Sequence, residues 1–427
     1  MKFLYNISIF HLELAFKVLS WFNDKIKSGL EGRKKSLEIV KSKIKNEDSV
    51  LWMHAASLGE YEQGLPVLEK LKGKYPNHKV LITFFSPSGY ENVVKKNKED
   101  ILCYLPFDKK STISEFVKAV HPEIFFTVKY DFWYHLLDEL KKTNAKVFVI
   151  SALFYENQVY FKPQGKWFVN ELKKNVDWTF HQTEKSLSLA QKVGLTKGSV
   201  SGDTRFDRVK QIKNRDNFVE FISEFKAEKK LLVFGSSWEA EEKMAQILSQ
   251  KLENFKILIA PHDLKRVQNL KQIFPSAIIY SEIAKSQNRK TEIEIETTSQ
   301  LHDFTTSQIL IIDSIGLLSK LYSYADIAVV GGGFHDKGLH NILEAATFGV
   351  PVIFGNKYKK NPEADALIAQ NGGKSFDNEE MTADFVLELS ENSNLLQEMS
   401  ENAGNFVHSQ PNSSEIIFKK INEFFNI

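Results

Sequence analysis

Three consecutive glycines and a group of polar side chains give residues 331–344 the clearest chemical signature in this sequence. Gly331, Gly332 and Gly333 follow an apolar run and precede an expected helix. The polar side chains of the loop and of the helix start are His335, Lys337, His340, Asn341 and Glu344. Glycine lets a backbone approach a ligand closely, and the amides at a helix start attract anions. The loop is therefore predicted to bind an anion such as a phosphate or a carboxylate.

A carboxylate that follows several small residues marks a second candidate, at 54–60. The run His-Ala-Ala-Ser-Leu-Gly-Glu comes after an apolar segment, so a strand, a loop and a helix start are expected. Glu60 would point into the space above the strand end, where it could accept a proton from a substrate hydroxyl. The alternative is a capping box, in which Glu60 folds back on Ser57. The pattern alone favours neither interpretation.

Two further charged residues follow expected strands in the first half. Asp131 comes after the apolar run 124–128 and would lie near Glu60 if the two strands are neighbours, although an N-cap is the commoner role of such an acid. Arg205 lies in the run Gly-Asp-Thr-Arg-Phe-Asp. Its guanidinium could bind an anion through two nitrogens, or it could belong to a surface network of aspartates and arginines.

The second half carries two more motifs at expected strand ends. Ser236 and Ser237 could cap a helix or donate to a phosphate, and Pro261 and His262 follow another strand. No cysteine cluster and no closely spaced pair of histidines or aspartates offers a site for a divalent cation. The sequence therefore predicts neither a metal nor another cofactor.

Short apolar runs alternate with helical patterns along the chain, which predicts parallel sheets built from βαβ units. The expected strands are 50–54, 80–85, 101–105, 124–128, 147–151 and 178–181 in the first half, and 231–235, 257–260, 277–280, 309–313, 327–330 and 352–354 in the second. A length of 427 residues fits two Rossmann-like domains. The polar stretch 287–307 is expected to be a surface hairpin or loop. A net charge of +2 without a basic stripe argues against a nucleic-acid partner.

The N-terminus reads as an amphipathic helix. Phe3, Ile7, Phe10, Leu14, Val18 and Trp21 share one sector of a helical wheel. Glu13 and Lys17 make a full membrane span unfavourable, because about 20 predominantly apolar residues are needed. Lysines and arginines up to Lys35 would attract anionic headgroups, so an interfacial helix is predicted. The alternative is a helix packed on the protein's own core.

Together these features are typical of a metal-independent nucleotide-sugar glycosyltransferase. The motifs at 54–60, 202–207, 235–238, 260–262 and 331–346 resemble, in that order, those of the 3-deoxy-D-manno-octulosonic acid (Kdo) transferases of lipid A. The resemblance implies a GT-B fold, in which two Rossmann-like domains face a central cleft. It also implies CMP-Kdo as donor, a lipid A precursor as acceptor, inversion at the anomeric carbon, and a monotopic enzyme on the cytoplasmic face of the inner membrane.

The resemblance also assigns residues. Glu60 matches the family's proton acceptor, and Asp131 and Arg205 match positions that support the transition state. CMP contacts would come from Pro261, His262, Ile315, Gly316, Leu317, Asn341, Ile342, Leu343 and Glu344, beside Ser236, Ser237, Gly332, Gly333, Lys337 and His340 from the motifs above. Many relatives have glutamate where this chain has Asp131, so its carboxylate is one methylene shorter. The implied domains are a membrane helix at 1–30, an acceptor domain at 31–205, a linker at 206–228, a donor domain at 229–400 and terminal helices at 401–427.

Two other functions stay open on the sequence. A nucleotide-sugar epimerase could use the same fold, but it would need no lipid-facing helix. A non-catalytic membrane scaffold would need neither Glu60 nor Arg205.

Overall fold

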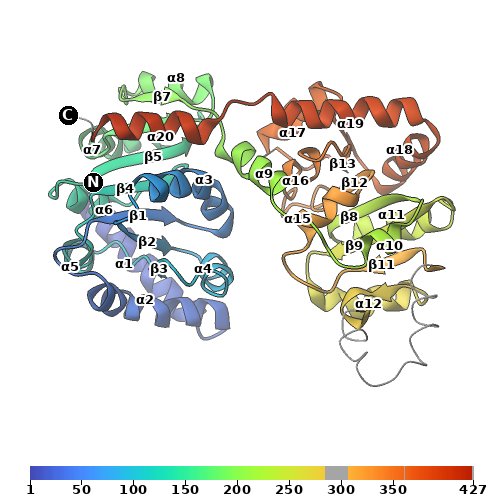
Figure 1. The fold of residues 1–427 in the computed structure, drawn as a ribbon. Helices are drawn as coiled ribbons and strands as arrows, with labels where there is room; N and C mark the ends of the chain where they lie inside the picture. The colour runs from blue at the N-terminus through green and yellow to red at the C-terminus, as the bar shows by residue number, and fades with distance from the viewer. Residues whose placement is uncertain (284–305, 360, 426–427) are drawn as a thin grey trace. The chain divides into compact units, whose positions relative to one another are not determined.

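The computed structural model describes residues 1–283, 306–359 and 361–425. The chain forms two units, each with its own sheet: residues 1–208 with 411–427 make unit 1, and residues 209–410 make unit 2. Figure 1 shows helices on both sides of each sheet. Most of the polar stretch 287–307 lies outside the described residues, so its predicted loop is not considered further.

In unit 1 the described strands form a seven-stranded parallel sheet in the order β3-β2-β1-β4-β5-β6-β7. The strands are β1 (Val50–Ala55), β2 (Lys79–Phe84), β3 (Ile101–Tyr104), β4 (Ile124–Val128), β5 (Lys146–Ala152), β6 (Trp178–His181) and β7 (Gly198–Val200). Their near-continuous burial explains the unbroken apolar runs, because helices cover both faces of a parallel sheet. The six strands predicted in this half are confirmed, and β1 and β4 are neighbours.

Alternate side chains of these strands enter two separate cores. Trp52 of β1 packs in the core that α2, α5, α6, α7 and α8 cover, whereas Met53 packs in the core beneath α3, α4 and α20. These helices are α2 (Asp24–Lys43), α3 (Leu58–Lys74), α4 (Pro87–Val94), α5 (Lys110–Val120), α6 (Tyr134–Leu140), α7 (Lys166–Asn175), α8 (Glu184–Lys192) and α20 (Ser413–Glu423). The strand period of two therefore builds the layered architecture.

Unit 2 repeats this plan with a second parallel sheet of seven described strands, in the order β10-β11-β9-β8-β12-β13-β14. The strands are β8 (Lys230–Ser237), β9 (Phe255–Pro261), β10 (Ile278–Ile279), β11 (Ile309–Ile311), β12 (Ile327–Val330), β13 (Val352–Gly355) and β14 (Gly373–Phe376). The helices are α9 (Thr204–Asn214), which crosses the boundary between the units, α10 (Ile222–Lys226), α11 (Glu239–Ser249), α12 (Val267–Ile273), α15 (Leu318–Leu321), α16 (Leu343–Ala346), α17 (Pro362–Ala369), α18 (Glu379–Glu391) and α19 (Ser393–His408). The two sheets confirm the prediction of two Rossmann-like domains.

The end of the chain lies in unit 1. Sequence reasoning placed residues 401–427 after the second domain, but α20 packs on α3, where Lys70 pairs with Glu415 at 2.7 Å. Phe424 extends this contact to the ring of Phe148 in β5, at 5.2 Å between centroids. The predicted linker 206–228 contains the greater part of α9 and all of α10.

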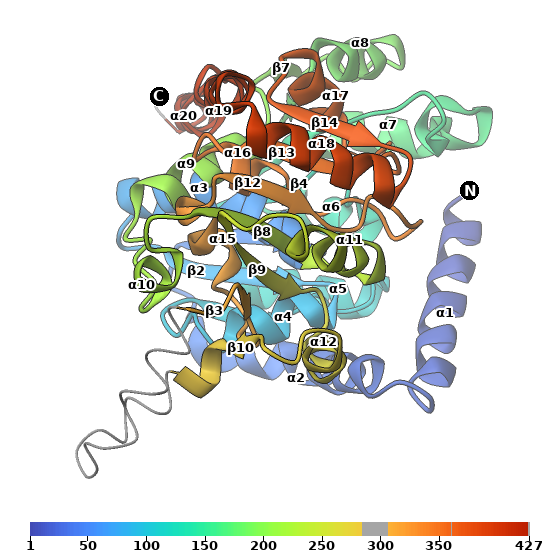
Figure 2. The ribbon, with the colours of Figure 1, turned by 90° about the vertical axis from the view of Figure 1, so that its right-hand side faces the viewer.

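The N-terminal helix α1 (Lys2–Leu19) is bound to unit 1 through polar groups and leaves much of its apolar surface exposed. The Tyr5 hydroxyl donates to Asp108 Oδ2 at 2.6 Å, and His135 Nε2 lies 2.7 Å from Asn6 Oδ1. The six side chains of the predicted apolar sector are all exposed, with Phe3 at 73% and Trp21 at 79%. Figure 2 shows α1 joined to α2 by a short turn. Among the described helices none is both long and apolar enough to cross a membrane.

Candidate functional site

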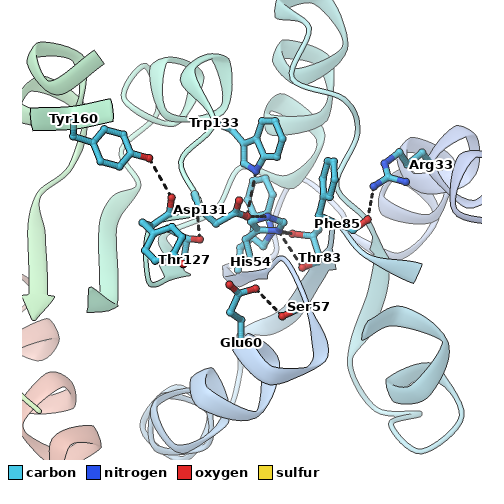
Figure 3. Close-up of polar contacts among 12 residues, drawn as sticks. Arg33, His54, Ser57, Glu60, Thr83, Phe85, Thr127, Asp131, Trp133 and Tyr160 are labelled. Atoms are coloured by element: carbon cyan, nitrogen blue, oxygen red, sulfur yellow. Dashed lines mark hydrogen bonds and ion pairs between the residues drawn. The ribbon is translucent and has the colours of Figure 1, made fainter. Parts of the chain in front are cut away.

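Glu60 lies in the first turn of α3, directly after β1. The Ser57 hydroxyl donates to Glu60 Oε2 at 3.0 Å, as Figure 3 shows. Glu60 therefore does fold back on Ser57, but Ser57 makes no side-chain hydrogen bond to a helix-start amide, so the reciprocal capping box is absent. Burial raises the pKa of the half-buried Glu60 carboxyl, and the negative charge of Asp131 raises it further. A carboxylate with a raised pKa is a stronger base, which suits removal of a proton from a hydroxyl.

Asp131 follows β4, which is the neighbour of β1 in the sheet. Its Oδ2 lies 2.7 Å from His54 Nε2 and accepts a hydrogen bond from Trp133 Nε1 at 3.2 Å. The N-cap alternative is wrong, since the first amides of α6 bind Asp108 instead. The predicted proximity of Asp131 and Glu60 is confirmed by the effect of the Asp131 charge on the Glu60 pKa.

A chain of hydrogen bonds beneath the sheet edge holds Asp131 in place. Trp52 Nε1 donates to Thr83 Oγ1 at 2.9 Å, and Thr83 Oγ1 lies 2.9 Å from His54 Nδ1. The Thr83 carbonyl oxygen also lies 3.1 Å from Nδ1, so the two ring nitrogens of His54 bridge Thr83 and Asp131. Sequence reasoning quoted His54 without a role. The sequence feature that could have identified His54 is its position at the carboxyl end of β1. Thr83 lies opposite it in the neighbouring strand β2.

The turn between β4 and Asp131 has an unusual backbone. Lys129 adopts a φ of 62°, in the left-handed region that residues other than glycine rarely occupy. Its amide donates to the Ile150 carbonyl at 2.9 Å, which fixes the turn. The ammonium charge of Lys129 opposes the rise in the pKa of Glu60. Strained backbone of this kind is common at functional sites, and sequence analysis did not select Lys129.

Arg205 is paired inside unit 1. Its Nε donates to Asp203 Oδ2 at 2.8 Å, and Gln63 Nε2 of α3 donates to Asp203 Oδ1 at 2.7 Å. Burial would raise the pKa of Asp203, but Arg205 and these hydrogen bonds hold it below its usual value. The arginine network that sequence analysis offered as an alternative is therefore present. It ties Arg205 to α3, one turn beyond Glu60.

In unit 2 several residues of the predicted donor site surround one tryptophan. His262 stacks on Trp238 at 4.5 Å and 19°, and Lys337 Nζ lies 4.2 Å from the Trp238 ring centre. His335 meets the other ring edge-on at 4.5 Å, and the His262 and His340 rings are 4.6 Å apart. Three histidines and a lysine therefore gather within contact of one another. Sequence reasoning placed His335 in the predicted anion-binding loop but did not select Trp238 for the site.

Burial and mutual repulsion keep two of these histidines neutral. Burial, followed by His262 and His335, lowers the pKa of His340 to about 4. Burial and the Lys337 charge also lower the pKa of His262. A bound anion would offset the repulsion among these groups and so favour protonation of the histidine rings. It would then accept hydrogen bonds from the Lys337 ammonium and from several ring N–H groups.

The glycine loop is shaped by close backbone packing. Gly332 has a φ of 93°, and its amide donates to Glu241 Oε1 at 3.1 Å. A Cβ on Gly333 would lie 2.5 Å from the Gly355 amide nitrogen of β13, so no larger residue fits. Glu241 is fully buried, and its Oε2 accepts from the Trp238 amide at 2.9 Å. This carboxylate links the glycine loop to the start of α11, a role that the sequence did not suggest.

The remaining predicted donor residues fall into two groups. Ser236 has a left-handed φ of 52°, whereas Ser237 is buried and its hydroxyl has no partner in the described part of the chain. Pro261 ends β9 directly before His262. The second group lies before α15. Ile315 is 77% exposed, Gly316 has a left-handed φ of 92°, and Leu317 directly precedes α15. Ser237 and Pro261 adjoin the Trp238 cluster, because Ser237 precedes Trp238 and its carbonyl accepts from the His262 amide at 3.0 Å.

The helix expected after the glycine loop is present and short. The run Ile342-Leu343-Glu344 starts α16, which is a single turn that ends before Gly349 and Pro351. Asn341 Oδ1 accepts from the Leu343 amide at 3.1 Å, and Asn341 Nδ2 donates to Glu344 Oε1 at 3.1 Å. The two residues that the resemblance places on CMP therefore hold each other. Among residues 1–283, 306–359 and 361–425, no group of three or more possible ligands is arranged to hold a metal ion.

Comparisons with known proteins point to one family of glycosyltransferases. Residues 31–208 match the profile of a family described as 3-deoxy-D-manno-octulosonic-acid transferase (kdotransferase). A 3-deoxy-D-manno-octulosonic acid transferase of Chlamydophila psittaci is 27% identical over 346 residues, which cover 79% of this chain and 76% of that protein. Residues 31–208 carry a domain of the Kdo transferase family, and most of the chain is similar to Kdo transferases. The chain is therefore a glycosyltransferase, as the sequence predicted.

Two further similarities limit what can be inferred for this chain from its relatives. A bifunctional glycosyltransferase/methyltransferase of Fusobacterium nucleatum is 25% identical over 329 residues, which cover 75% of this chain. The chain spans about half the length of that relative, 49%. A UDP-GlcNAc 2-epimerase of Neisseria meningitidis, solved with UDP-GlcNAc, aligns with a TM-score of 0.61 at 16% identity over 88% of this chain and 100% of its own. At that identity the likeness supports the fold alone, and the predicted GT-B fold class is confirmed.

Proposed function

We propose that this enzyme transfers Kdo from CMP-Kdo to a lipid A precursor of the lipid IVA type, with inversion at the anomeric carbon and without a metal. The family supplies the transferred sugar, and the setting of Glu60 carries the proposal for the chemistry. Glu60 is half-buried, bound by Ser57 and close to the charge of Asp131. These are the conditions under which a carboxylate accepts a proton near neutral pH.

The proposed reaction is a single displacement. A hydroxyl oxygen of the acceptor forms a bond to the anomeric carbon of Kdo while the bond from that carbon to the CMP phosphate oxygen breaks. The hydroxyl proton passes to Glu60, and CMP leaves with the electron pair. Asp131 keeps Glu60 basic and is itself held by His54 and Trp133, so we assign it a positioning role in this chain.

For the donor we propose the polar residues of unit 2. Lys337 and the histidines at 262, 335 and 340 offer a cation and ring N–H groups, which suit a phosphate. The hydroxyl of Ser237 is buried without a partner in the described part of the chain and is free to donate. A one-turn helix such as α16 has a smaller macrodipole than a longer helix. We therefore propose these side chains, rather than helix-start amides, as the phosphate ligands. Arg205 is proposed to act on the carboxylate of Kdo or on the departing phosphate only after its pairing with Asp203 loosens.

For the acceptor we propose presentation at the cytoplasmic face of the inner membrane, with the enzyme bound as a monotopic protein. The exposed apolar side chains Phe3 and Phe10 of α1, and Trp21 in the turn after it, support this location. Replacing these three by serine should lower recovery on anionic liposomes without changing CMP binding. Unchanged sedimentation with liposomes would reject the membrane role.

The decisive experiment incubates the protein with CMP-Kdo and a tetraacylated lipid A precursor and counts the added sugars by mass spectrometry. Glu60→Gln should lower kcat by about 100-fold to 10,000-fold, the usual range for a general base, while CMP-Kdo binding is retained. Glu62→Gln is the matched control, because Glu62 lies in the same helix but pairs with Arg208 at 2.6 Å. Normal transfer by folded Glu60→Gln would refute the mechanism.

The same assay tests the two other functions. An epimerase would convert a nucleotide sugar without any lipid acceptor, and a scaffold would bind no cytidine nucleotide. The family profile and the Chlamydophila psittaci relative favour the transferase over both, because they are Kdo transferases rather than epimerases.

A further inference from the structure

A cavity of about 870 Å³ lies in unit 1, bordered by α1, α2 and residues 106–112. Its volume falls within the range of small-molecule sites, of the order of 300–1,000 Å³. The basic residues that line it are Lys17, Lys27, Arg33, Lys34 and Lys109. The acidic residues that line it are Glu13, Asp24 and Glu31. None of these side chains belongs to the proposed active site.

Arg33 is the unusual member of this lining. It is only 7% exposed, yet it forms no ion pair with any carboxylate in the described part of the chain. Its guanidinium donates to the carbonyls of Gly29 and Phe85, and Nε has no hydrogen-bond partner there. Aromatic rings surround the cation, with the Phe85 and Phe107 centres at 4.6 and 5.0 Å. A buried cation without a counter-ion is costly, so this site has a place for an anion.

The other charged side chains of the cavity do not neutralise Arg33, so the anion would come from a ligand. Glu13 is held by Lys17 at 3.0 Å and also by Lys109, so these three neutralise one another in part. Lys27 and Lys34 project from the same helix as Arg33 and make no ion pair within the described ranges. Asp24 and Glu31 would repel a bare anion but can accept hydrogen bonds from hydroxyl groups. A ligand with a phosphate and neighbouring hydroxyls would satisfy both kinds of side chain.

The position of the cavity indicates where such a ligand comes from. Trp21, which lines it, is 79% exposed, and the adjacent Phe22 is 82% exposed. Both continue the exposed apolar surface of α1, and aromatic side chains of this kind prefer the headgroup level of a membrane. Leu30, Pro106 and Phe107 supply apolar wall beside the charged groups. A lipid headgroup can therefore reach the cavity from a bilayer on which α1 lies.

We propose that this cavity binds the phosphorylated, hydroxyl-bearing headgroup of a membrane lipid, with Arg33, Lys27 and Lys34 on the phosphate. Asp24 and Glu31 accept hydrogen bonds from the headgroup hydroxyls. The site is separate from Glu60 and Asp131, and it rests on the geometry of unit 1 rather than on the proposed acceptor. Its occupation would fix the N-terminal helices against the bilayer surface.

The test uses the full chain and water-soluble dihexanoyl phosphatidylglycerol, with binding measured by isothermal titration calorimetry. The double variant Lys27→Ala/Lys34→Ala should raise Kd by about 10-fold or more, since two charge-assisted contacts are lost. The matched control is Lys25→Ala/Lys35→Ala, which removes the same charge from exposed positions of α2 outside the cavity. It should change Kd by less than about 3-fold, because exposed charges are screened. Surface lysines are chosen because replacing the buried Arg33 could unfold the unit.

Two further ligands separate the sources of the phosphate. Dihexanoyl phosphatidylcholine and inorganic phosphate should each bind at least about 10-fold more weakly than the phosphatidylglycerol, because one lacks the hydroxyls and net charge and the other lacks the lipid. Equal weakening by the two double variants would reduce the effect to general electrostatics and overturn the site. Equally tight inorganic phosphate or phosphatidylcholine, or no saturable binding of phosphatidylglycerol, would also overturn it.

Discussion

The attachment of α1 depends on one buried carboxylate whose ionisation can be tested. Asp108 is 1% exposed and accepts hydrogen bonds from the Tyr5 hydroxyl at 2.6 Å and from the His135 and Leu136 amides at 2.8 and 2.9 Å. Burial raises the pKa of Asp108 to about 6, although these hydrogen bonds oppose the rise. Removing the Tyr5 hydroxyl should therefore weaken both α1 docking and the start of α6.

The sign of the pH effect follows from that raised pKa. An unfolded aspartate has a pKa of about 3.9, so the contribution of protonated Asp108 to stability is complete below pH ~4 and is lost as pH rises through about 6. The difference of about 2 pKa units corresponds to roughly 3 kcal/mol. At pH 8 the ionised Asp108 relies on Tyr5, and Tyr5→Phe should cost about 2 kcal/mol. At pH 5 about nine-tenths of Asp108 is protonated and the cost should fall to about 1 kcal/mol.

Hydrogen exchange of the His135 and Leu136 amides measures this directly, because both amides donate to Asp108. Opening free energies at pH 8 and pH 5, corrected for intrinsic exchange rates, give the loss caused by Tyr5→Phe at each pH. Tyr75→Phe is the matched control, since the Tyr75 hydroxyl donates to Asn422 Oδ1 at 2.9 Å and that acceptor does not ionise. For the Tyr75→Phe control, hydrogen exchange is measured at the backbone amides around Asn422.

The reasoning fails if Tyr5→Phe costs the same at pH 5 and pH 8. It also fails if the Tyr75→Phe control shows the same dependence on pH. Either result would mean that Asp108 does not change its ionisation in this range, or that α1 is held by its apolar contacts rather than by this hydrogen bond.

Three further predictions concern the proposed sites. Asp131→Asn should lower the pKa of Glu60 and move the acid limb of the kcat/KM profile to lower pH, and an unmoved limb would remove Asp131 from the mechanism. Gly333→Ala should destabilise unit 2 by about 1–3 kcal/mol in urea unfolding, because its Cβ would meet the Gly355 backbone; a wild-type midpoint would contradict this packing. Trp238→Leu should raise the Kd of CMP by about 10-fold through the loss of the His262 stack and the Lys337 cation–π contact, and calorimetry with an unchanged Kd would exclude the cluster.

The strands were predictable wherever an apolar run marked burial on both faces. β14 (Gly373–Phe376) was missed because it begins with glycine, lysine and serine and lies at the edge of its sheet, where burial is incomplete. The helix after the glycine loop was predicted without a length, and the structure limits it to one turn before Gly349 and Pro351. The local sequence pattern does not predict an edge strand with incomplete burial, or where packing ends a helix.

The candidate site was predictable where chemistry followed a strand, as for Glu60 and Asp131. The residues that hold Asp131 in place could not be predicted. His54 and Thr83 are 29 residues apart in the sequence and meet only because β1 pairs with β2. Trp238 was passed over for the same reason: its neighbours His262 and Lys337 come from distant loops. Arg205 fitted two interpretations, and only the position of Asp203 and Gln63 distinguished them.

The return of the chain to unit 1 at Pro411 has a consequence for synthesis. Unit 2 is one continuous segment, residues 209–410, whereas the core of unit 1 includes Ile417 and Ile421 of α20. Domains fold as the chain leaves the ribosome, from the N-terminus onward. Here the first sheet to be translated is the last to be completed, so until α20 emerges the nascent chain carries an unfilled apolar groove over α3. Chaperone contact and degradation during translation should therefore concentrate on the N-terminal half.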